Sequence, residues 1–242
     1  MYSRIPMPKV EWKEENRRYS LCFFPFIGAV IGGFLILWQW VCGIIHIGGL
    51  VNAVVSVLIP VFVTGGIHID GFCDMTDALA SCAEKSKKLE IMSDPHIGSF
   101  AVIGLCSVFL LQLALFCEVS GYYVVAIGYI LSRTLSGLAA VTLRSAKSDG
   151  ALQNFVKPAH RKITIVFLVV IAVLCAGGMV IADLFAGIAI CAVCALGFII
   201  YRAVAYKNFG GITGDTEGWF LQVTETAILA AVFITEKVVM LL

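Results

Sequence analysis

Three aspartates at the end of a hydrophobic segment are the residues of this sequence best suited to chemistry. Asp70, Asp74 and Asp77 lie at spacing i, i+4 and i+7 within the stretch 65–79. If this stretch is helical, the three carboxylates project from one face over two turns. Like charges this close repel each other, and protonation or a bound cation relieves the repulsion. Because carboxylates are ligands that Mg²⁺ prefers, and Mg²⁺ also binds substrate phosphates, we expect a Mg²⁺ site for phosphoryl transfer.

Two nearby residues extend this expected site. Asp94, in the same connection between hydrophobic segments, is a candidate fourth carboxylate ligand. His68 is a candidate general base for a hydroxyl nucleophile, because histidine titrates near neutrality. The alternatives are a hydrogen-bonded structural histidine and a solvated acidic loop. Apolar residues interleaved with the aspartates, such as Phe72 and Met75, favour the functional interpretation.

The segment 207–217 is a second candidate, rich in glycine and in hydroxyl-bearing side chains. Such a loop offers backbone N–H groups and hydroxyls to a phosphate. The residues predicted to hold substrate are Lys207, Gly211, Thr213, Gly214, Asp215 and Thr216. Glycine-rich turns between membrane spans are common, so this composition alone is weak evidence for a phosphate site. The evidence is stronger because the segment is expected on the same side of the membrane as the aspartates.

Arg133 and Glu225 fall inside hydrophobic segments, where an unpaired charge is costly. They either neutralise each other or help to hold a substrate phosphate. The sequence leaves both alternatives open.

The elements that position these residues are predicted by composition. The 242 residues are 60% hydrophobic and 14% charged, whereas soluble domains average about 45–50% apolar and about 25% charged residues. This excludes a soluble enzyme, a disordered chain and a nucleic-acid binder. We expect a single integral membrane domain, 1–242, with an all-α polytopic bundle embedded in the lipid bilayer.

Hydrophobic runs long enough to cross a bilayer predict about seven spans. Their ranges are 20–45, 48–67, 97–117, 121–143, 163–182, 184–206 and 218–242. The last run is interrupted by polar residues that include Gln222 and Glu225. If it is only interfacial, the C-terminus lies on the same side as the N-terminus.

The basic residues predict the orientation of these spans. Of the 17 Lys and Arg residues, all but Arg133 and Lys237 lie in 1–18, 85–88, 144–162 and 202–207. Because positive charge is retained on the cytoplasmic side, we expect a cytoplasmic N-terminus in the inner (plasma) membrane. The connections 68–96, 144–162 and 207–217 would then carry the site on the cytoplasmic face, as expected of an enzyme that uses cytosolic substrates.

Three stretches together resemble the cobalamin synthase family, the adenosylcobinamide-GDP ribazoletransferases. They are GGIHIDGFCDMTDAL (65–79), LEIMSDPHIGSF (89–100) and FGGITGDTEG (209–218), in the family's order and at similar separations. The resemblance runs from about residue 19 to the C-terminus, and the family's length and helical membrane architecture agree. The chain departs from the family pattern at Ala78, Pro95, His96, Glu217 and Trp219.

The resemblance implies an activity and its cofactor. The phosphocobinamide group of adenosylcobinamide-GDP would pass to a ribose hydroxyl of α-ribazole or its 5′-phosphate, with release of GMP and with Mg²⁺ as cofactor. Asp70, Asp74, Asp77 and Asp94 would hold the metal, and His68 or an aspartate would accept the proton. Arg133, Lys207 and 213–216 would hold phosphates.

Two other classes of membrane protein remain as alternatives. A CDP-alcohol phosphotransferase also uses an aspartate cluster and Mg²⁺, but Asp70-Gly71 here lacks that enzyme's following Ala-Arg. A cation transporter would place carboxylates deep within several spans, where Glu225 is the clear candidate. The acceptor, and whether the chain forms a homo-oligomer, stay open.

Overall fold

The computed structural model describes residues 17–150 and 152–241, and this part of the chain is a bundle of helices without a β-sheet. The basic residues Arg4, Lys9 and Lys13 used to predict orientation lie outside the described residues. The long helices are α2 (Phe24–Ile45), α3 (Gly49–Thr64), α6 (Ser99–Glu118), α7 (Tyr122–Thr142), α9 (Arg161–Ala182), α10 (Leu184–Phe209) and α11 (Gly214–Val239). The short elements are η1 (Ser20–Phe23), α4 (Ile67–Ala80), α5 (Lys85–Ile91) and α8 (Gln153–Val156).

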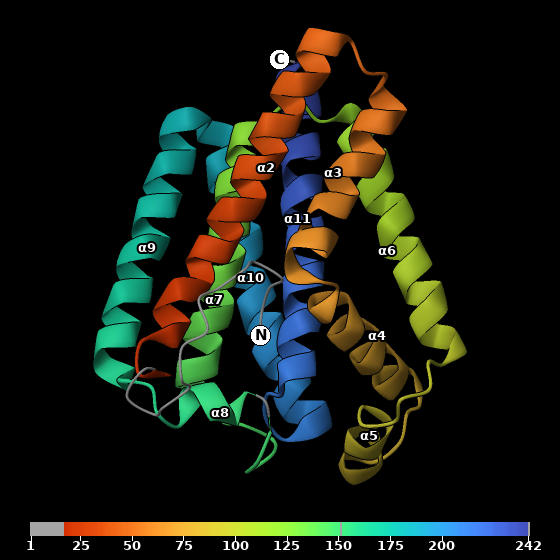
Figure 1. Ribbon diagram of the computed structural model, residues 1–242, viewed down its shortest axis with the longest axis vertical. Helices are drawn as coiled ribbons and strands as arrows, with labels where there is room; N and C mark the ends of the chain where they lie inside the picture. The colour runs from red at the N-terminus through yellow and green to blue at the C-terminus, as the bar shows by residue number, and fades with distance from the viewer. Residues whose placement is uncertain (1–16, 151, 242) are drawn as a thin grey trace.

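Successive long helices run in opposite directions through the bundle (Figure 1). Among the described residues, six helices are long and apolar enough to cross a membrane, and a seventh crossing results if α3 and α4 count as one bent span. The predicted all-α membrane bundle of about seven spans is therefore confirmed. The doubtful last span is a continuous helix, α11, and the C-terminal end lies opposite α5 and α8.

The centre of the bundle is formed by α7 and α11. In their most apolar windows, 78% and 61% of the residues are buried, against 17% for α9 and 22% for α6. Helices α6 and α9 therefore present their apolar side chains outward, as expected for contact with lipid. The two central helices also carry the buried polar side chains that the sequence singled out, Arg133 on α7 and Glu225 on α11.

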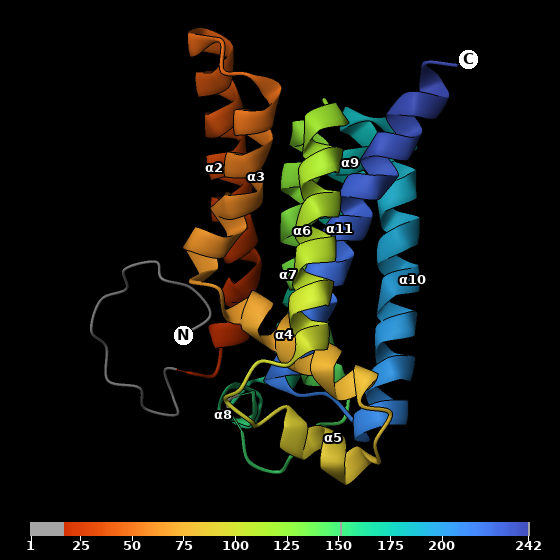
Figure 2. The ribbon, with the colours of Figure 1, turned by 90° about the vertical axis from the view of Figure 1, so that its right-hand side faces the viewer.

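The predicted span 48–67 corresponds to α3, which ends three residues before the predicted limit. Helix α3 ends at Thr64 after 16 residues, and α4 continues at an angle of 95° to it. The two residues between them, Gly65 and Gly66, have φ values of 70° and 83°, a left-handed conformation that glycine adopts without steric cost. These glycines form the bend that turns α4 across the end of the bundle (Figure 2).

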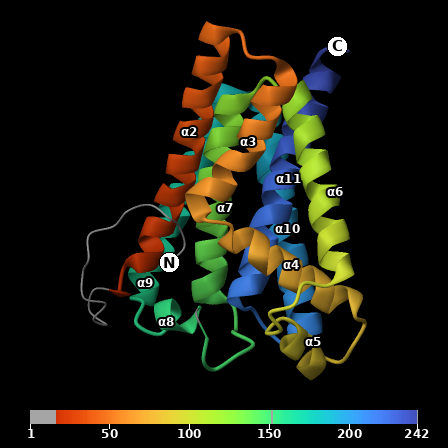
Figure 3. The same ribbon diagram turned by 45° about the vertical axis from the view of Figure 1, so that its right-hand side comes forward.

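The connections 68–96 and 207–217 are also more helical than expected. The first contains α4, packed against α6 and α11, followed by α5 (Figure 3). The second contracts to 210–213, because α10 continues to Phe209 and α11 begins at Gly214. Lys207 therefore lies in the last turn of α10 and Asp215 in the first turn of α11.

Candidate active site

The site is built where α4 crosses the beginning of α11. A Cβ atom added to Gly71 would lie 2.8 Å from the Cα atom of Asp215, and one added to Gly218 would lie 2.9 Å from the carbonyl oxygen of His68. The two backbones therefore pack with no room for side chains between them. This close contact brings the aspartate face of α4 beside Asp215, which is distant in sequence.

Asp70, Asp74 and Asp215 form the acidic cluster of the site. Asp74 is half-buried, and it lies close enough to Asp70, Asp215 and Asp77 for their charges to disfavour its own. No residue of the described chain donates a hydrogen bond to the carboxylate of Asp70 or Asp74. Asp215 accepts one long hydrogen bond from the Thr213 hydroxyl, at 3.4 Å. These carboxylates are therefore largely free to bind a ligand.

Asp77 has a different role from its two neighbours on α4. Its Oδ2 accepts a hydrogen bond from the Gly98 N–H at 2.6 Å, and its Oδ1 accepts one from the Ala101 N–H at 2.8 Å. These N–H groups belong to the start of α6, where a negative charge is favourable. The predicted face of three carboxylates exists because α4 is helical, but Asp77 uses both oxygens to hold α6.

Asp94 lies apart from the cluster, on the exposed connection between α5 and α6. Its Oδ1 accepts a hydrogen bond from the His96 N–H at 2.9 Å and lies 2.6 Å from His96 Nδ1. The backbone N–H and the ring of His96 lower the pKa of Asp94. Asp94 is thus hydrogen-bonded to His96 and does not join Asp70 and Asp74 as a fourth carboxylate of the cluster.

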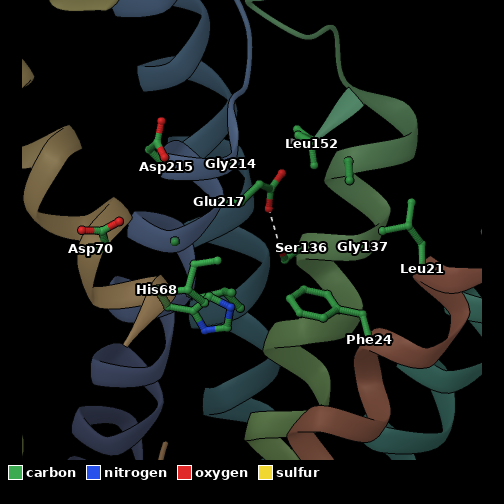
Figure 4. A pocket seen from close by; sticks show the side chains of 14 residues that line it. Leu21, Phe24, His68, Asp70, Ser136, Gly137, Leu152, Gly214, Asp215 and Glu217 are labelled. Atoms are coloured by element: carbon green, nitrogen blue, oxygen red, sulfur yellow. Dashed lines mark hydrogen bonds between the residues drawn. The ribbon is translucent and has the colours of Figure 1, made fainter. Parts of the chain in front are cut away.

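A cavity of about 170 Å³ opens beside the acidic cluster, between α4 and α11 on one side and η1, α2 and α7 on the other (Figure 4). Its apolar walls include Leu21, Phe24, Leu152 and Leu221, and glycines supply part of the remainder. The polar residues that line it are His68, Asp70, Ser136, Asp215 and Glu217. The cavity is therefore apolar along its walls and acidic at one side.

A second cavity of about 100 Å³ adjoins the first, and Leu152, Gly214 and Asp215 line both. Lys147 contributes a positive charge to it, held by a hydrogen bond from its Nζ to the Ser93 hydroxyl at 3.0 Å. Backbone hydrogen bonds tie the Lys147 loop to the start of α11: Ile212 N–H donates to the Arg144 carbonyl, and Ala146 N–H donates to the Ile212 carbonyl. A cation therefore faces the acidic cluster across this cavity.

The predicted phosphate loop is mostly the start of a helix. Thr213 caps α11 by accepting a hydrogen bond from the Thr216 N–H at 3.2 Å, and the Thr216 hydroxyl accepts one from the Thr213 N–H at 2.9 Å. Both hydroxyls are thus engaged in a capping box. Gly214 and Asp215 line the cavities, whereas Gly211 packs against the Arg144–Ser145 backbone. The exposed Lys207 lines neither cavity.

Arg133 and Glu225 form a buried ion pair below the site, and neither lines the 170 Å³ cavity. Arg133 also donates a hydrogen bond to the Ser132 hydroxyl at 2.9 Å. Both charges border a small space of about 10 Å³ that His68 also lines. Of the two alternatives for these residues, the structure favours mutual neutralisation.

His68 is buried between these two spaces. Its exposed fraction is 8%, its ring meets the edge of Phe24 at a centroid distance of 6.1 Å, and its Nε2 has no hydrogen-bond partner among the described residues. The ring lies on the same helix as Asp70 and lines the same cavity. His68 therefore lines the same cavity as Asp70 and Asp215, with a ring nitrogen that has no partner among the described residues.

Among the polar residues that line the two cavities, five were not predicted as site residues: Ser136, Ser145, Lys147, Gln153 and Glu217. Glu217 was noted only as a departure from the family pattern, and Lys147 only as part of a basic stretch. Ser136 lies in the stretch 132–137 around Arg133, which agrees only weakly with the family pattern and did not single out this serine.

The carboxylates of the site fit a Mg²⁺ ion that is bound in part by the protein and in part by water and substrate. Within the described residues, no group of three or more His, Cys, Asp or Glu side chains is arranged to hold a metal ion by itself. Mg²⁺, however, is usually bound by one or two carboxylates together with water and substrate phosphates. Asp70 and Asp74, with free oxygens, and Asp215 beside them meet that requirement.

A bundle of membrane-spanning helices with an acidic cavity at one end defines a multi-pass membrane protein with an enzyme-like site. Comparison with known proteins gives the family: the model for cobalamin-5-phosphate synthase matches residues 1–233, and the chain belongs to that family. It is therefore a transferase of cobalamin biosynthesis, as the resemblance of the three motifs implied. No solved structure matches it.

The curated relatives agree with the family assignment. An adenosylcobinamide-GDP ribazoletransferase of Lachnoclostridium phytofermentans is 39% identical over 241 residues, which cover 99% of this chain and 92% of the relative. Proteins with the same name from Clostridium perfringens and Treponema denticola are each 32% identical. Those two matches cover 95% and 96% of this chain and 93% and 94% of the relatives.

Proposed function

We propose that this protein transfers the phosphocobinamide group of adenosylcobinamide-GDP to a ribose hydroxyl of α-ribazole or α-ribazole 5′-phosphate, with release of GMP and in a Mg²⁺-dependent reaction. The family and the names of the relatives support this reaction. The observation that carries the proposal is that Asp70 and Asp74, from one motif, lie near Asp215, from another, and that Asp70 and Asp215 line the same cavity.

Asp70, Asp74 and Asp215 would hold the metal ion. When bound there, Mg²⁺ would supply positive charge to the oxygens of the diphosphate and of the departing GMP. Asp77 supports this site indirectly, because it fixes α6 against α4.

Lys147 would attract the diphosphate into the second cavity, next to Asp215. The positive end of α11 also begins there, at Gly214, whose backbone faces open space. His68 would accept the proton of the attacking hydroxyl, because its ring borders the cavity in which that hydroxyl has room to lie.

The site would face the cytoplasm in the inner (plasma) membrane. Apart from Arg133 and Lys237, the described Lys and Arg residues lie at the end of the bundle that carries α5 and α8, where the site lies, and positive charge is retained on the cytoplasmic side. Nucleotide substrates would thus reach the site from the cytosol, and the large corrinoid would rest against the membrane surface.

The reaction can be tested with the purified protein in detergent or liposomes. Incubation with adenosylcobinamide-GDP, α-ribazole 5′-phosphate and Mg²⁺ should release GMP and form a cobalamin phosphate in equal amounts. Omission of the α-ribazole compound should abolish both products. GMP release that does not depend on the acceptor would instead indicate hydrolysis and contradict the proposed transfer.

A further inference from the structure

Glu217 carries a buried carboxylate oxygen that has no partner in the described chain. The residue is 6% exposed, and its Oε2 accepts a hydrogen bond from the Ser136 hydroxyl. The Tyr201 hydroxyl also interacts with this carboxylate, whereas Oε1 has no hydrogen-bond partner among the described residues. Figure 4 shows Glu217 with one oxygen directed to Ser136 and the other directed away from it, toward Leu152. An unpaired buried oxygen of this kind is costly unless a ligand or water donates to it.

The surroundings of this oxygen indicate the kind of ligand. Glu217 lines the 170 Å³ cavity, whose facing walls are apolar and include Leu21, Phe24 and Leu152. Such a space suits a molecule with a flat apolar part and at least one hydroxyl or N–H donor. A carboxylate that accepts a hydrogen bond from a ribose hydroxyl is an established mode of nucleoside recognition.

The direction of Glu217 also relates it to the proposed reaction centre. Asp215 and Glu217 both lie in the first turn of α11, but Asp215 faces Asp70 on α4 and Glu217 faces Ser136 on α7 (Figure 4). Both side chains line the same cavity. A ribose held by Glu217 would therefore have its remaining hydroxyl next to the acidic cluster.

We infer that Glu217 binds the nucleoside acceptor: its free oxygen accepts a hydrogen bond from one ribose hydroxyl, while the apolar walls of the cavity pack against the base. This inference rests on the proposed function, because it assigns the acceptor of that reaction to this cavity. Ser136 is a positioning residue, which holds the other oxygen of Glu217. The diphosphate donor then occupies the adjoining cavity beside Lys147.

Equilibrium binding of α-ribazole to the purified protein, in the absence of the donor, tests the inference without turnover. Glu217→Gln should weaken nucleoside binding by roughly 2-fold to 10-fold, because a hydrogen bond contributes about 0.5–1.5 kcal/mol net. The same variant should bind adenosylcobinamide-GDP as the unchanged protein does. Glu90→Gln, which alters an exposed carboxylate on α5, is the matched control and should bind both substrates normally.

Analogues of the nucleoside provide a second measurement, which can be made on the unchanged protein and so does not depend on whether a variant folds. Of the 2′-deoxy and 3′-deoxy forms, one should bind the unchanged protein about as weakly as α-ribazole binds Glu217→Gln. That analogue should lose nothing further in the variant. If both analogues bind as tightly as α-ribazole, or if Glu217→Gln binds α-ribazole normally, the inference is wrong. If the unchanged protein binds no α-ribazole at all, the proposed function itself fails.

Discussion

At the scale of single residues, the aspartates of α4 divide between two tasks. Asp70 and Asp74 keep their oxygens free beside Asp215, whereas Asp77 gives both oxygens to the N–H groups of Gly98 and Ala101. The spacing of the three residues is the same in the sequence, and only their neighbours in the fold distinguish them. Mutation of each should therefore have a different effect.

Asp74→Asn should abolish GMP release while the protein remains folded in the membrane. The amide has nearly the same shape as the carboxylate but lacks the charge needed to hold Mg²⁺, so the rate should fall by at least roughly 100-fold, equivalent to about 3 kcal/mol. Asp183→Asn is the matched control: Asp183 caps α10 through the Ala186 N–H, and asparagine caps equally well. Near-normal turnover of Asp74→Asn would remove this residue from the metal site.

Arg133 and Glu225 allow a test that separates an ion pair from a phosphate site. Replacement of one partner alone, as in Arg133→Met, leaves a buried charge unpaired and should destabilise the protein by about 3–5 kcal/mol. The double variant Arg133→Met with Glu225→Met should recover much of that loss, measured as thermal unfolding in detergent. If the double variant is as stable as the unchanged protein but has a strongly raised KM for adenosylcobinamide-GDP, Arg133 binds the substrate phosphate after all.

At the scale of elements, the site depends on the contact between α4 and α11. Gly71 and Gly218 let the two backbones approach within van der Waals distance, so that Asp70 and Asp74 meet Asp215. The bend at Gly65 and Gly66 sets the direction of α4. The position of the acidic cluster is thus a property of helix packing more than of any loop.

Gly71→Ala should separate these helices and lower activity. The new methyl group would lie 2.8 Å from both the Cα atom and the carbonyl oxygen of Asp215, and overpacking of this kind costs typically about 1–3 kcal/mol. We expect reduced thermal stability together with reduced GMP release. Gly33→Ala on α2 adds the same methyl group where nothing lies within 4 Å, and it should leave both quantities unchanged. Equal effects of the two substitutions would contradict a special role for the α4–α11 contact.

The sequence predicts the elements better than it predicts their contacts. Long apolar runs and the i, i+4, i+7 spacing indicate the spans and the acidic face of α4, because both follow from local periodicity. The capping role of Asp77 and the pairing of Glu217 with Ser136 arise from residues distant in the chain. No local pattern contains that information, so only the folded structure supplies it.

At the scale of the whole molecule, the two ends of the bundle differ: one end carries the candidate site and the other does not. The turn between α2 and α3 lies at one end of the bundle, and α4, α5, α8 and the two cavities lie toward the other (Figures 1 and 2). The three sequence motifs gather at the second end. This arrangement suits an enzyme that receives substrates from one side of the membrane.

The orientation can be tested by labelling from outside intact cells. A tag inserted after Gly48 should react with a reagent that does not cross the membrane, and a tag within 145–160 should react only after the cells are opened. The expectation follows from the basic residues at the site's end of the bundle. The reverse labelling pattern would separate the site from cytosolic nucleotides and contradict the proposed topology.

The central feature of the proposed site is one divalent cation held jointly by α4 and α11. Binding of Mn²⁺, as a paramagnetic substitute for Mg²⁺, can be measured by electron paramagnetic resonance on the purified protein together with a non-reacting guanosine diphosphate. We predict one tightly bound ion in the unchanged protein, and its loss in Asp74→Asn and in Asp215→Asn but not in Asp183→Asn. Mn²⁺ binding that is unaffected by both Asp74→Asn and Asp215→Asn would contradict the account.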